Sequence, residues 1–291
     1  MRARSRQVQT SDGVTLEVYD TGGNGAPVLM LHGWSQSQEM FRHQRDGLGE
    51  RRVITYDMRG HGRSEKPGRG YRIARLAADV RDILVDLDIR DVHLLGWSMG
   101  VSVIWSYLEL FGDRRVRSLV LVDQPAAVAA QLWMSAIEQQ SAGCILPADG
   151  LGTLANAIAD DAGGDATVRA FVRSMFTGPV DDGLWSFVSS EVAQTPRRVA
   201  APLLFDHGAQ DWRELLPTIA KPTLVLGCDG SHVSAESQRY VASRIPGALV
   251  HIFPRDVASS HFPFLENPEA FNEVVRVFLD ANAVSDIRPV R

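Results

Sequence analysis

The sequence predicts an α/β protein whose mostly parallel sheet is interrupted by one helical insertion. Short β-rich apolar runs alternate with longer stretches of helical periodicity, the pattern of parallel strands joined by crossover helices. This alternation stops after residue 125, where helical patches and turn-rich breaks replace it, and it resumes near residue 215. The 291 residues therefore divide into a core of residues 1–125 and 215–291 and a helical cap of residues 126–214.

The chain is expected to open on a hairpin. Residues 7–10 and 14–19 flank Ser11-Asp12-Gly13, a turn signal, so the sheet begins with an antiparallel pair and is mixed. Apolar side chains in residues 73–87 recur at spacings of three and four, which predicts an amphipathic crossover helix. Residues 284–291 are typical of a frayed tail. Buried parallel strands are expected at 28–31, 53–57, 92–96, 119–123, 223–227 and 249–253.

Composition argues against several classes of protein. Apolar residues make up 45% of the chain and charged residues 22%, as in packed water-soluble proteins. The 30 Lys and Arg residues against 35 Asp and Glu give a net charge of -5, which argues against a nucleic-acid partner. No apolar run approaches the roughly 18 residues of a membrane span. Cys144 and Cys228 form neither a metal pattern nor a disulfide framework, which favours a reduced, cytoplasmic setting and predicts no metal site.

The strongest local signal is Gly96-Trp97-Ser98-Met99-Gly100, which follows an apolar strand and opens the helical stretch 101–111. This is the G-x-S-x-G nucleophile elbow in its required strand-to-helix context. The small residues at both ends let neighbouring segments approach closely. The pattern therefore predicts that Ser98 is an exposed nucleophile at a helix N-terminus.

A serine hydroxyl is a weak nucleophile until a base takes its proton. His261 follows the last predicted strand and precedes a helix that begins near residues 267–268, where the chain order Ser, acid, His would place the base. His32 and His61 sit beside glycines in turns, where structural hydrogen bonds are expected. The other histidines are interpreted as surface or packing residues: His43, His93, His207, His232 and His251.

The residues alone leave two candidates for the acid that orients His261. Asp123 ends the strand 119–123 and comes 25 residues after Ser98, one strand-helix unit later. Asp229 follows the strand 223–227. Either aspartate would stand at the carboxyl end of a strand, the edge where the active sites of parallel sheets form.

A developing oxyanion needs backbone N–H donors about 3 Å away. Met99, the residue after the nucleophile, supplies one, and Trp34, in the turn after the strand 28–31, supplies the second. The Trp34 indole is also expected to line the substrate pocket. Substrate contacts are further expected from Trp97, Trp133, Trp185 and Phe262.

Four motifs together resemble the α/β-hydrolase superfamily: His32-Gly33-Trp34, Asp57-Met58-Arg59-Gly60-His61-Gly62-Arg63-Ser64, the elbow, and residues 261–269, which begin His261-Phe262-Pro263. The resemblance spans nearly the whole chain outside the cap. It implies an α/β-hydrolase fold, with an eight-stranded, mostly parallel sheet flanked by helices, a Ser-His-acid triad and a cap over the pocket.

The chain departs from the superfamily at one position. Most members carry the acid after the penultimate strand as G-x-x-D, but Gly230 stands there when counted from Gly227, and Asp229 is one residue early. Zearalenone lactonases and cofactor-independent quinolone dioxygenases instead carry the acid after the strand that follows the elbow, which corresponds to Asp123 here. Their H-F-P resembles His261-Phe262-Pro263, so the resemblance favours Asp123.

A serine at position 98 argues against haloalkane dehalogenases and epoxide hydrolases, which need a carboxylate nucleophile. The favoured function is a serine hydrolase that cleaves an ester or lactone of an apolar or aromatic small molecule through an acyl-enzyme, without a cofactor. One alternative is a cofactor-independent dioxygenase in which His261 and Asp123 deprotonate an aromatic hydroxyl. Carbon-carbon bond hydrolysis, perhydrolysis and a ligand-binding receptor are further alternatives on the same scaffold. The sequence predicts neither the substrate's identity nor an oligomeric state.

Overall fold

An eight-stranded sheet forms the centre of the protein in the computed structural model, which describes residues 4–283. Residues 284–291, expected to form a frayed tail, lie outside the described residues. The spatial order of the strands is β1-β2-β4-β3-β5-β6-β7-β8. Their bounds are β1 Arg4–Gln9, β2 Thr15–Asp20, β3 Asn24–Leu31, β4 Arg51–Tyr56, β5 Val92–Trp97, β6 Val116–Val122, β7 Thr223–Cys228 and β8 Leu249–Phe253.

The pairing of the strands confirms the predicted mixed sheet. β1 pairs antiparallel with β2 across the predicted hairpin, β2 pairs antiparallel with β4, and the remaining neighbours run parallel. Every residue of β5 and β7 is buried, as expected for apolar strands covered on both faces. By contrast, five of the six residues of the edge strand β1 are exposed.

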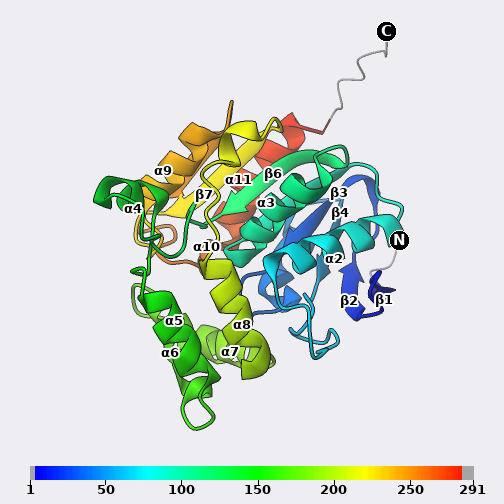
Figure 1. Cartoon of the computed structure of the whole chain (residues 1–291). Helices are drawn as coiled ribbons and strands as arrows, with labels where there is room; N and C mark the ends of the chain where they lie inside the picture. Colours follow the sequence, from blue (N-terminus) through cyan, green and yellow to red (C-terminus); the bar gives the residue numbers. More distant parts are fainter. Residues whose placement is uncertain (1–3, 284–291) are drawn as a thin grey trace.

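Helices cover both faces of the sheet (Figure 1). α2 packs against α3 in front of the strands in this view, while α11 lies behind them and contacts α1. None of the helices within residues 4–283 has the length and apolarity needed to cross a membrane. Outside the insertion the helical elements are η1 Gln38–Phe41, α1 Arg42–Gly47, α2 Ile73–Asp86, α3 Met99–Phe111, η2 Leu216–Thr218, α9 Ala235–Arg244, α10 Pro263–Glu266 and α11 Pro268–Ala281.

The segment between β6 and β7 contains helices and contributes no strand to the sheet. We call residues 126–214 the cap. α5 contacts α6 and α8, and α6 contacts α7, so four of the five helices form one group beside the sheet, while α4 lies apart from them and contacts α9 (Figure 1). The helices of the cap are α4 Ala136–Ala142, α5 Gly150–Ala159, α6 Gly164–Ser174, α7 Asp182–Val192 and α8 Arg197–Gly208.

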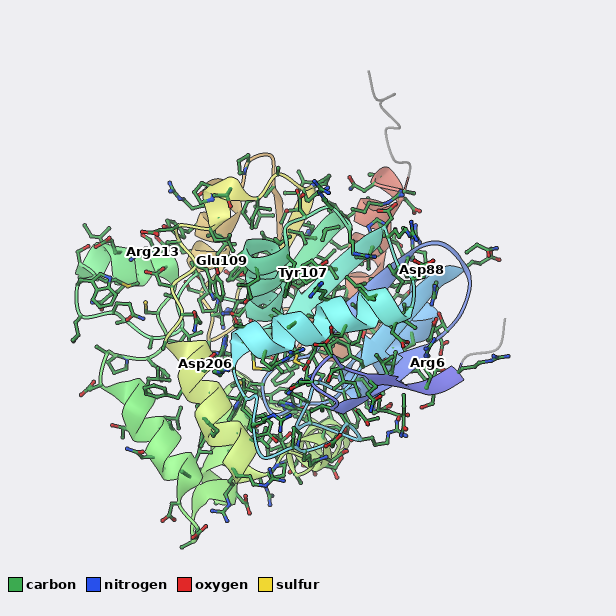
Figure 2. All side chains as sticks on the ribbon, turned by 45° about the vertical axis from the view of Figure 1, so that its right-hand side comes forward. Arg6, Asp88, Tyr107, Glu109, Asp206 and Arg213 are labelled. Atoms are coloured by element: carbon green, nitrogen blue, oxygen red, sulfur yellow. The ribbon has the colours of Figure 1, made fainter. Side chains whose placement is uncertain are left out.

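Side-chain hydrogen bonds join the cap to the core. Asp206 of α8 accepts a hydrogen bond from the Ile73 backbone N–H at 2.8 Å and so caps the first turn of α2. Figure 2 shows Asp206 beside the start of this helix. The Trp34 indole N–H donates to the Ala200 carbonyl at 2.8 Å, and the Ser37 hydroxyl donates to Glu191 at 2.5 Å.

Candidate active site

The elbow between β5 and α3 holds Ser98 in a strained conformation. Its φ is 53° and its ψ is -126°, a region that residues other than glycine rarely occupy. A Cβ atom at position 100 would lie 2.1 Å from the Leu31 carbonyl oxygen, and one at position 96 would lie 2.7 Å from the Gly100 backbone. Only glycine permits both close approaches, which keep the serine at the tip of the turn.

Asp123 stands beside the elbow at the carboxyl end of β6. The Ser98 backbone N–H donates to the Val122 carbonyl at 2.9 Å, which ties the elbow to this strand. Asp123 also has a positive φ, 50°, and its backbone N–H donates to Leu226 of β7 at 2.8 Å. The side chain is completely buried, so its charge depends on the groups that contact it.

Two side chains converge on one carboxylate oxygen of Asp123. His261 Nδ1 lies 2.7 Å from Oδ2, and the Ser231 hydroxyl donates to the same oxygen at 2.5 Å. Because the carboxylate accepts a hydrogen bond from Nδ1–H, Nε2 of His261 remains the basic nitrogen. The alternative acid, Asp229, has an exposed side chain that contacts no histidine within residues 4–283.

Burial controls the protonation of this pair. Removal from water lowers the pKa of His261, so the imidazole is neutral at neutral pH and the lone pair of Nε2 is not protonated. Burial raises the pKa of Asp123, while the Ser231 hydroxyl and the nearby His232 oppose that rise. No hydrogen bond between described residues joins the Ser98 hydroxyl to His261, although both line one cavity. Such catalytic bonds often tighten only when substrate is bound.

The predicted oxyanion donors flank Ser98. Met99 is the first residue of α3, so its N–H has no acceptor within the helix. Trp34 follows β3, and its N–H has no acceptor among residues 4–283 either. Two free N–H groups beside a nucleophile can stabilise a developing negative charge.

Two histidines hold the loops behind the oxyanion donors, as the sequence predicts. His32 Nδ1 lies 2.8 Å from the Gly33 carbonyl oxygen, and its Nε2 accepts from the Met58 N–H at 3.0 Å. His61 Nδ1 lies 3.0 Å from the Arg59 carbonyl oxygen. The bond between His32 and Met58 joins the loop after β3 to the loop after β4, and the other two contacts each lie within one loop.

Arg59 fixes the loop after β4 to its surroundings. Its fully buried guanidinium contacts Asp79 of α2 at 2.6 Å and Asp12 of the hairpin turn at 2.8 Å. Asp79 is buried as well, so the pair is shielded from solvent. The charged group therefore needs both carboxylates to offset its loss of hydration.

Of the five aromatic residues expected to contact substrate, only Trp34 lines the cavity. Trp97 points away from the cavity and donates its indole N–H to the His261 carbonyl at 2.8 Å, which supports the loop that carries this histidine. Phe262 is buried and stacks on Phe176, with ring centroids 4.2 Å apart. Trp133 is 74% exposed, and Trp185 packs against Phe176 within the cap. These four therefore do not line the cavity in this structure, because side-chain direction depends on packing that a motif does not record.

The cavity itself is small, at ≈ 30 Å³, which is room for about one or two water molecules. Its lining contains no Lys, Arg, Asp or Glu among the described residues. Core and cap both contribute, and the lining residues are Trp34, Ser98, Gln124, Pro125, Val128, Ile145, Phe171, Met175, Leu204, His207, His232, Val233 and His261.

Two lining residues, His207 and His232, are expected from the sequence to be surface or packing residues, not part of the site. His207 lies on the buried stripe of α8 with Leu203 and Leu204, and His232 follows β7, with its ring centroid 4.6 Å from that of His261. A histidine on an apolar helical stripe and one at the carboxyl edge of the sheet were the signals available. No group of three metal-ligating side chains suited to a metal ion occurs within residues 4–283.

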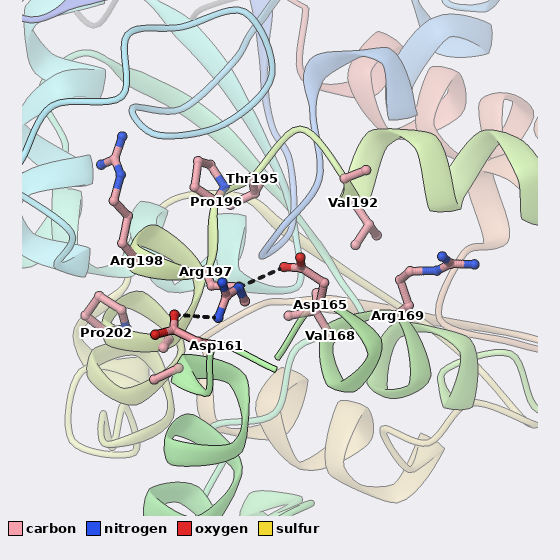
Figure 3. A pocket seen from close by; sticks show the side chains of 13 residues that line it. Asp161, Asp165, Val168, Arg169, Val192, Thr195, Pro196, Arg197, Arg198 and Pro202 are labelled. Atoms are coloured by element: carbon pink, nitrogen blue, oxygen red, sulfur yellow. Dashed lines mark hydrogen bonds and ion pairs between the residues drawn. The ribbon is translucent and has the colours of Figure 1, made fainter. Parts of the chain in front are cut away.

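Of the larger hollows outside this cavity, two bear on the assignment of the site. One of ≈ 400 Å³ shares Ile145, Phe171 and His232 with it and opens beside Cys144. The other, of ≈ 850 Å³, lies in the cap, where Arg197 forms ion pairs with Asp161 and Asp165 (Figure 3). The cap hollow includes neither Ser98 nor any histidine in its lining, so its size does not make it the catalytic site.

Comparison with protein families identifies the class of this protein. Residues 26–268 match the family model for the alpha/beta hydrolase fold, so the chain belongs to that family and is a hydrolase enzyme. The predicted fold class and family are confirmed. The eight-stranded, mostly parallel sheet with flanking helices is the architecture that the resemblance implied.

Individual relatives carry different names. A putative non-heme chloroperoxidase from Synechocystis is 29% identical over 85% of this chain and 90% of its own length. An esterase from Exiguobacterium antarcticum has a TM-score of 0.84 at 24% identity, covering 95% of this chain and all of that one. An enol-lactonase from Burkholderia xenovorans has a TM-score of 0.77 at 21% identity, covering 94% and 100%. At these identities, the two solved structures share the fold.

Proposed function

We propose that the protein is a serine hydrolase that cleaves an ester or lactone of an apolar or aromatic small molecule. The observation that carries the proposal is the 2.7 Å contact between His261 Nδ1 and Asp123, in a site where His261 and the strained Ser98 line one cavity. A neutral imidazole held by a buried carboxylate is suited to activate a neighbouring hydroxyl. Ser98, His261 and Asp123 form the proposed triad.

The first half of the reaction forms an acyl-enzyme. Ser98 Oγ attacks the carbonyl carbon while its proton moves to His261 Nε2, and the Met99 and Trp34 N–H groups bind the resulting oxyanion. Asp123 stabilises the imidazolium. As the tetrahedral intermediate collapses, the bond to the alkoxide leaving group breaks, and His261 returns the proton to that oxygen.

The second half releases the acid. A water molecule gives a proton to His261 and attacks the acyl carbon, and collapse of the second tetrahedral intermediate returns this proton to Ser98 Oγ. The products are a carboxylic acid and an alcohol, or one hydroxy acid when the substrate is a lactone. No cofactor is needed for these steps.

The lining of the cavity supports an apolar substrate. Val128, Ile145, Phe171, Met175 and Leu204 face the reacting groups from the cap. At ≈ 30 Å³ the cavity is far smaller than an ester, so binding requires the cap to move or the substrate to extend into the neighbouring ≈ 400 Å³ hollow. The names esterase and enol-lactonase, borne by two structural neighbours, are consistent with this substrate class.

Comparing Ser98→Ala with the unchanged protein tests the mechanism. The variant should lose about 10⁴-fold or more in kcat for p-nitrophenyl butanoate and should no longer react with a fluorophosphonate probe. Ser243→Ala, at an exposed position on α9, is the matched control and should behave like the unchanged protein. Full retention of turnover by Ser98→Ala would exclude the acyl-enzyme.

The histidine-rich cavity favours one second candidate, the cofactor-independent dioxygenase. His261, held by Asp123, could deprotonate an aromatic hydroxyl bound beside His207 and His232, and the anion would then react with dioxygen without the serine. Oxygen consumption by Ser98→Ala in the presence of a hydroxyquinolone would support this candidate. Absence of oxygen consumption, with esterase activity lost, would leave the hydrolase.

A further inference from the structure

Two imidazole groups in the catalytic cavity have a ring nitrogen without a partner. The Nδ1 atoms of His207 and His232 are both buried, and neither is hydrogen bonded to any group in residues 4–283. His207 is only 5% exposed, and it reaches the cavity from α8 of the cap. His232 reaches the same cavity from the loop after β7. Buried polar atoms are normally hydrogen bonded, so a polar group of a molecule bound in the cavity is a suitable partner for these nitrogens.

The two histidines are not equivalent to the proposed base. His261 Nδ1 is held by Asp123, and this contact both orients the ring and stabilises its protonated form. His207 and His232 have no carboxylate on Nδ1, so a proton taken from substrate would be unstable on either ring. Their arrangement therefore suits binding rather than proton transfer.

The charge of the cavity defines the kind of group that these rings can bind. No Lys, Arg, Asp or Glu of residues 4–283 lines it. Burial lowers the pKa of each ring to about 3, with the nearby His261 adding to the effect, so both are neutral near neutral pH. A neutral imidazole offers one donor and one acceptor, which match a hydroxyl or a carbonyl, whereas an ionised group would remain uncompensated.

We propose that the cavity selects uncharged esters or lactones that carry a second hydrogen-bonding atom, a hydroxyl or an oxo oxygen, and that His207 and His232 bind this atom. The proposal rests on the proposed function, because Ser98 chemistry places the scissile carbonyl in the same cavity. His232 also borders the ≈ 400 Å³ hollow, so the second polar atom can lie on the path that leads outward from Ser98.

Matched substrates test the selectivity. p-Nitrophenyl 3-hydroxybutanoate and 3-oxobutanoate differ from p-nitrophenyl butanoate by one polar atom. For at least one of them, kcat/KM should exceed that of the plain ester by about tenfold, the effect of one good hydrogen bond. His207→Phe or His232→Phe should reduce the ratio to about one, and the corresponding Gln variant should restore part of it. Equal kcat/KM values for all three esters in the unchanged protein, or an undiminished preference in both Phe variants, would overturn the proposal.

A binding measurement separates this proposal from the hydrolase proposal. In the Ser98→Ala background, phenol and toluene have nearly the same shape, but only phenol can form a hydrogen bond. Phenol should bind about tenfold more tightly by NMR titration, and His207→Phe or His232→Phe should abolish the difference. His43→Phe, at an exposed position on α1, is the control and should retain it.

The two proposals can then fail separately. If the unchanged protein resists fluorophosphonate labelling but the phenol preference appears and depends on either histidine, the hydrolase mechanism fails and the binding role stands. If labelling occurs but phenol and toluene bind equally, the binding role fails. Circular dichroism of each Phe variant verifies folding, and the Gln variants are used in its place if a Phe variant does not fold.

Discussion

The two walls of the catalytic cavity are built in different ways. On the core side, hydrogen bonds and positive φ angles hold Ser98 and Asp123, and Asp123 in turn holds His261. On the cap side, Phe171, Met175 and Leu204 present apolar surfaces, and the Nδ1 atom of His207 has no partner within the described residues. The sheet thus fixes the positions of the reacting atoms, while the cap contributes an apolar surface and one ring nitrogen without a hydrogen-bond partner among the described residues.

The largest expected effect concerns the core wall. Asp123→Asn should lower kcat by about 10⁴-fold, because the amide cannot stabilise the imidazolium and favours the wrong tautomer of His261. Asp229→Asn should change kcat less than about twofold, because the exposed Asp229 side chain lies away from the histidine. Steady-state kinetics with p-nitrophenyl butanoate measures both. A larger loss of kcat in Asp229→Asn than in Asp123→Asn would assign the acid to the loop after β7.

A large loss of stability is expected from Arg59→Ala. The substitution leaves Asp79 buried without its main counter-charge, so the free energy of unfolding should fall by about 3–5 kcal/mol. Urea denaturation measures this fall. Arg63→Ala is a suitable control, because its ion pair with Glu39 is solvent-exposed and should contribute less than about 1 kcal/mol. Equal effects would mean that the buried pair does not hold the core wall.

Acidification should weaken both walls. Burial lowers the pKa of His32 to about 4 and the pKa values of His61 and His207 to about 3, against about 6.5 in the unfolded chain. Between these values the unfolded state binds more protons, so the free energy of unfolding falls as the pH drops below about 6.5. Each histidine contributes about 1.4 kcal/mol per pH unit, and the raised pKa of Asp123 opposes them.

Urea titrations near pH 7 and near pH 5.5 measure the slope. His207→Phe should reduce it by the share of one histidine, and an unchanged slope would show that the cap histidine is not buried as a neutral ring. Fully pH-independent stability would contradict the burial of all three rings.

The smallest effect is expected at the joint between the walls. Trp34→Phe removes the hydrogen bond to the Ala200 carbonyl and should cost about 1 kcal/mol. Hydrogen exchange should accelerate in α8, which carries the Ala200 acceptor, and remain unchanged in the buried strands β5 and β6. Uniform acceleration in both regions would mean that cap and sheet open together.

Short local patterns indicate which residues form the core wall. A nucleophile elbow combines two glycines with a strand and a helix, so Ser98 could be identified from neighbouring residues alone. Chain order indicates His261 as the base. Gly230 stands where most family members carry the acid, and this departure from G-x-x-D favours Asp123. Each of these signals is short in sequence because the reacting groups stand at the ends of strands, where topology fixes their positions.

The cap wall was not predictable in the same way. Substrate contacts are expected from Trp133 and Trp185 of the cap, but helix packing leaves the first exposed to solvent and places the second against Phe176. The sequence indicates only a surface or packing role for His207, because its place in the cavity depends on how α8 lies relative to the sheet. Ser231, which donates to Asp123, comes from a loop 108 residues farther along the chain. Such contacts arise only when distant segments meet.

Because Asp123 directly follows β6, the loop after β7 can change in sequence without loss of the proposed acid. With the acid proposed there, the loop after β7, residues 229–234, carries no triad carboxylate, although this is where most family members place one. Ser231 must be retained for its bond to Asp123. Gly230 must also be retained, because a Cβ atom there would lie 2.5 Å from the Ser259 carbonyl oxygen, close to His261 in the chain. The other positions of the loop can vary without removing a residue of the proposed triad. A combinatorial library at the variable positions, centred on His232, should yield variants with different substrate preferences that retain Ser98, His261 and Asp123.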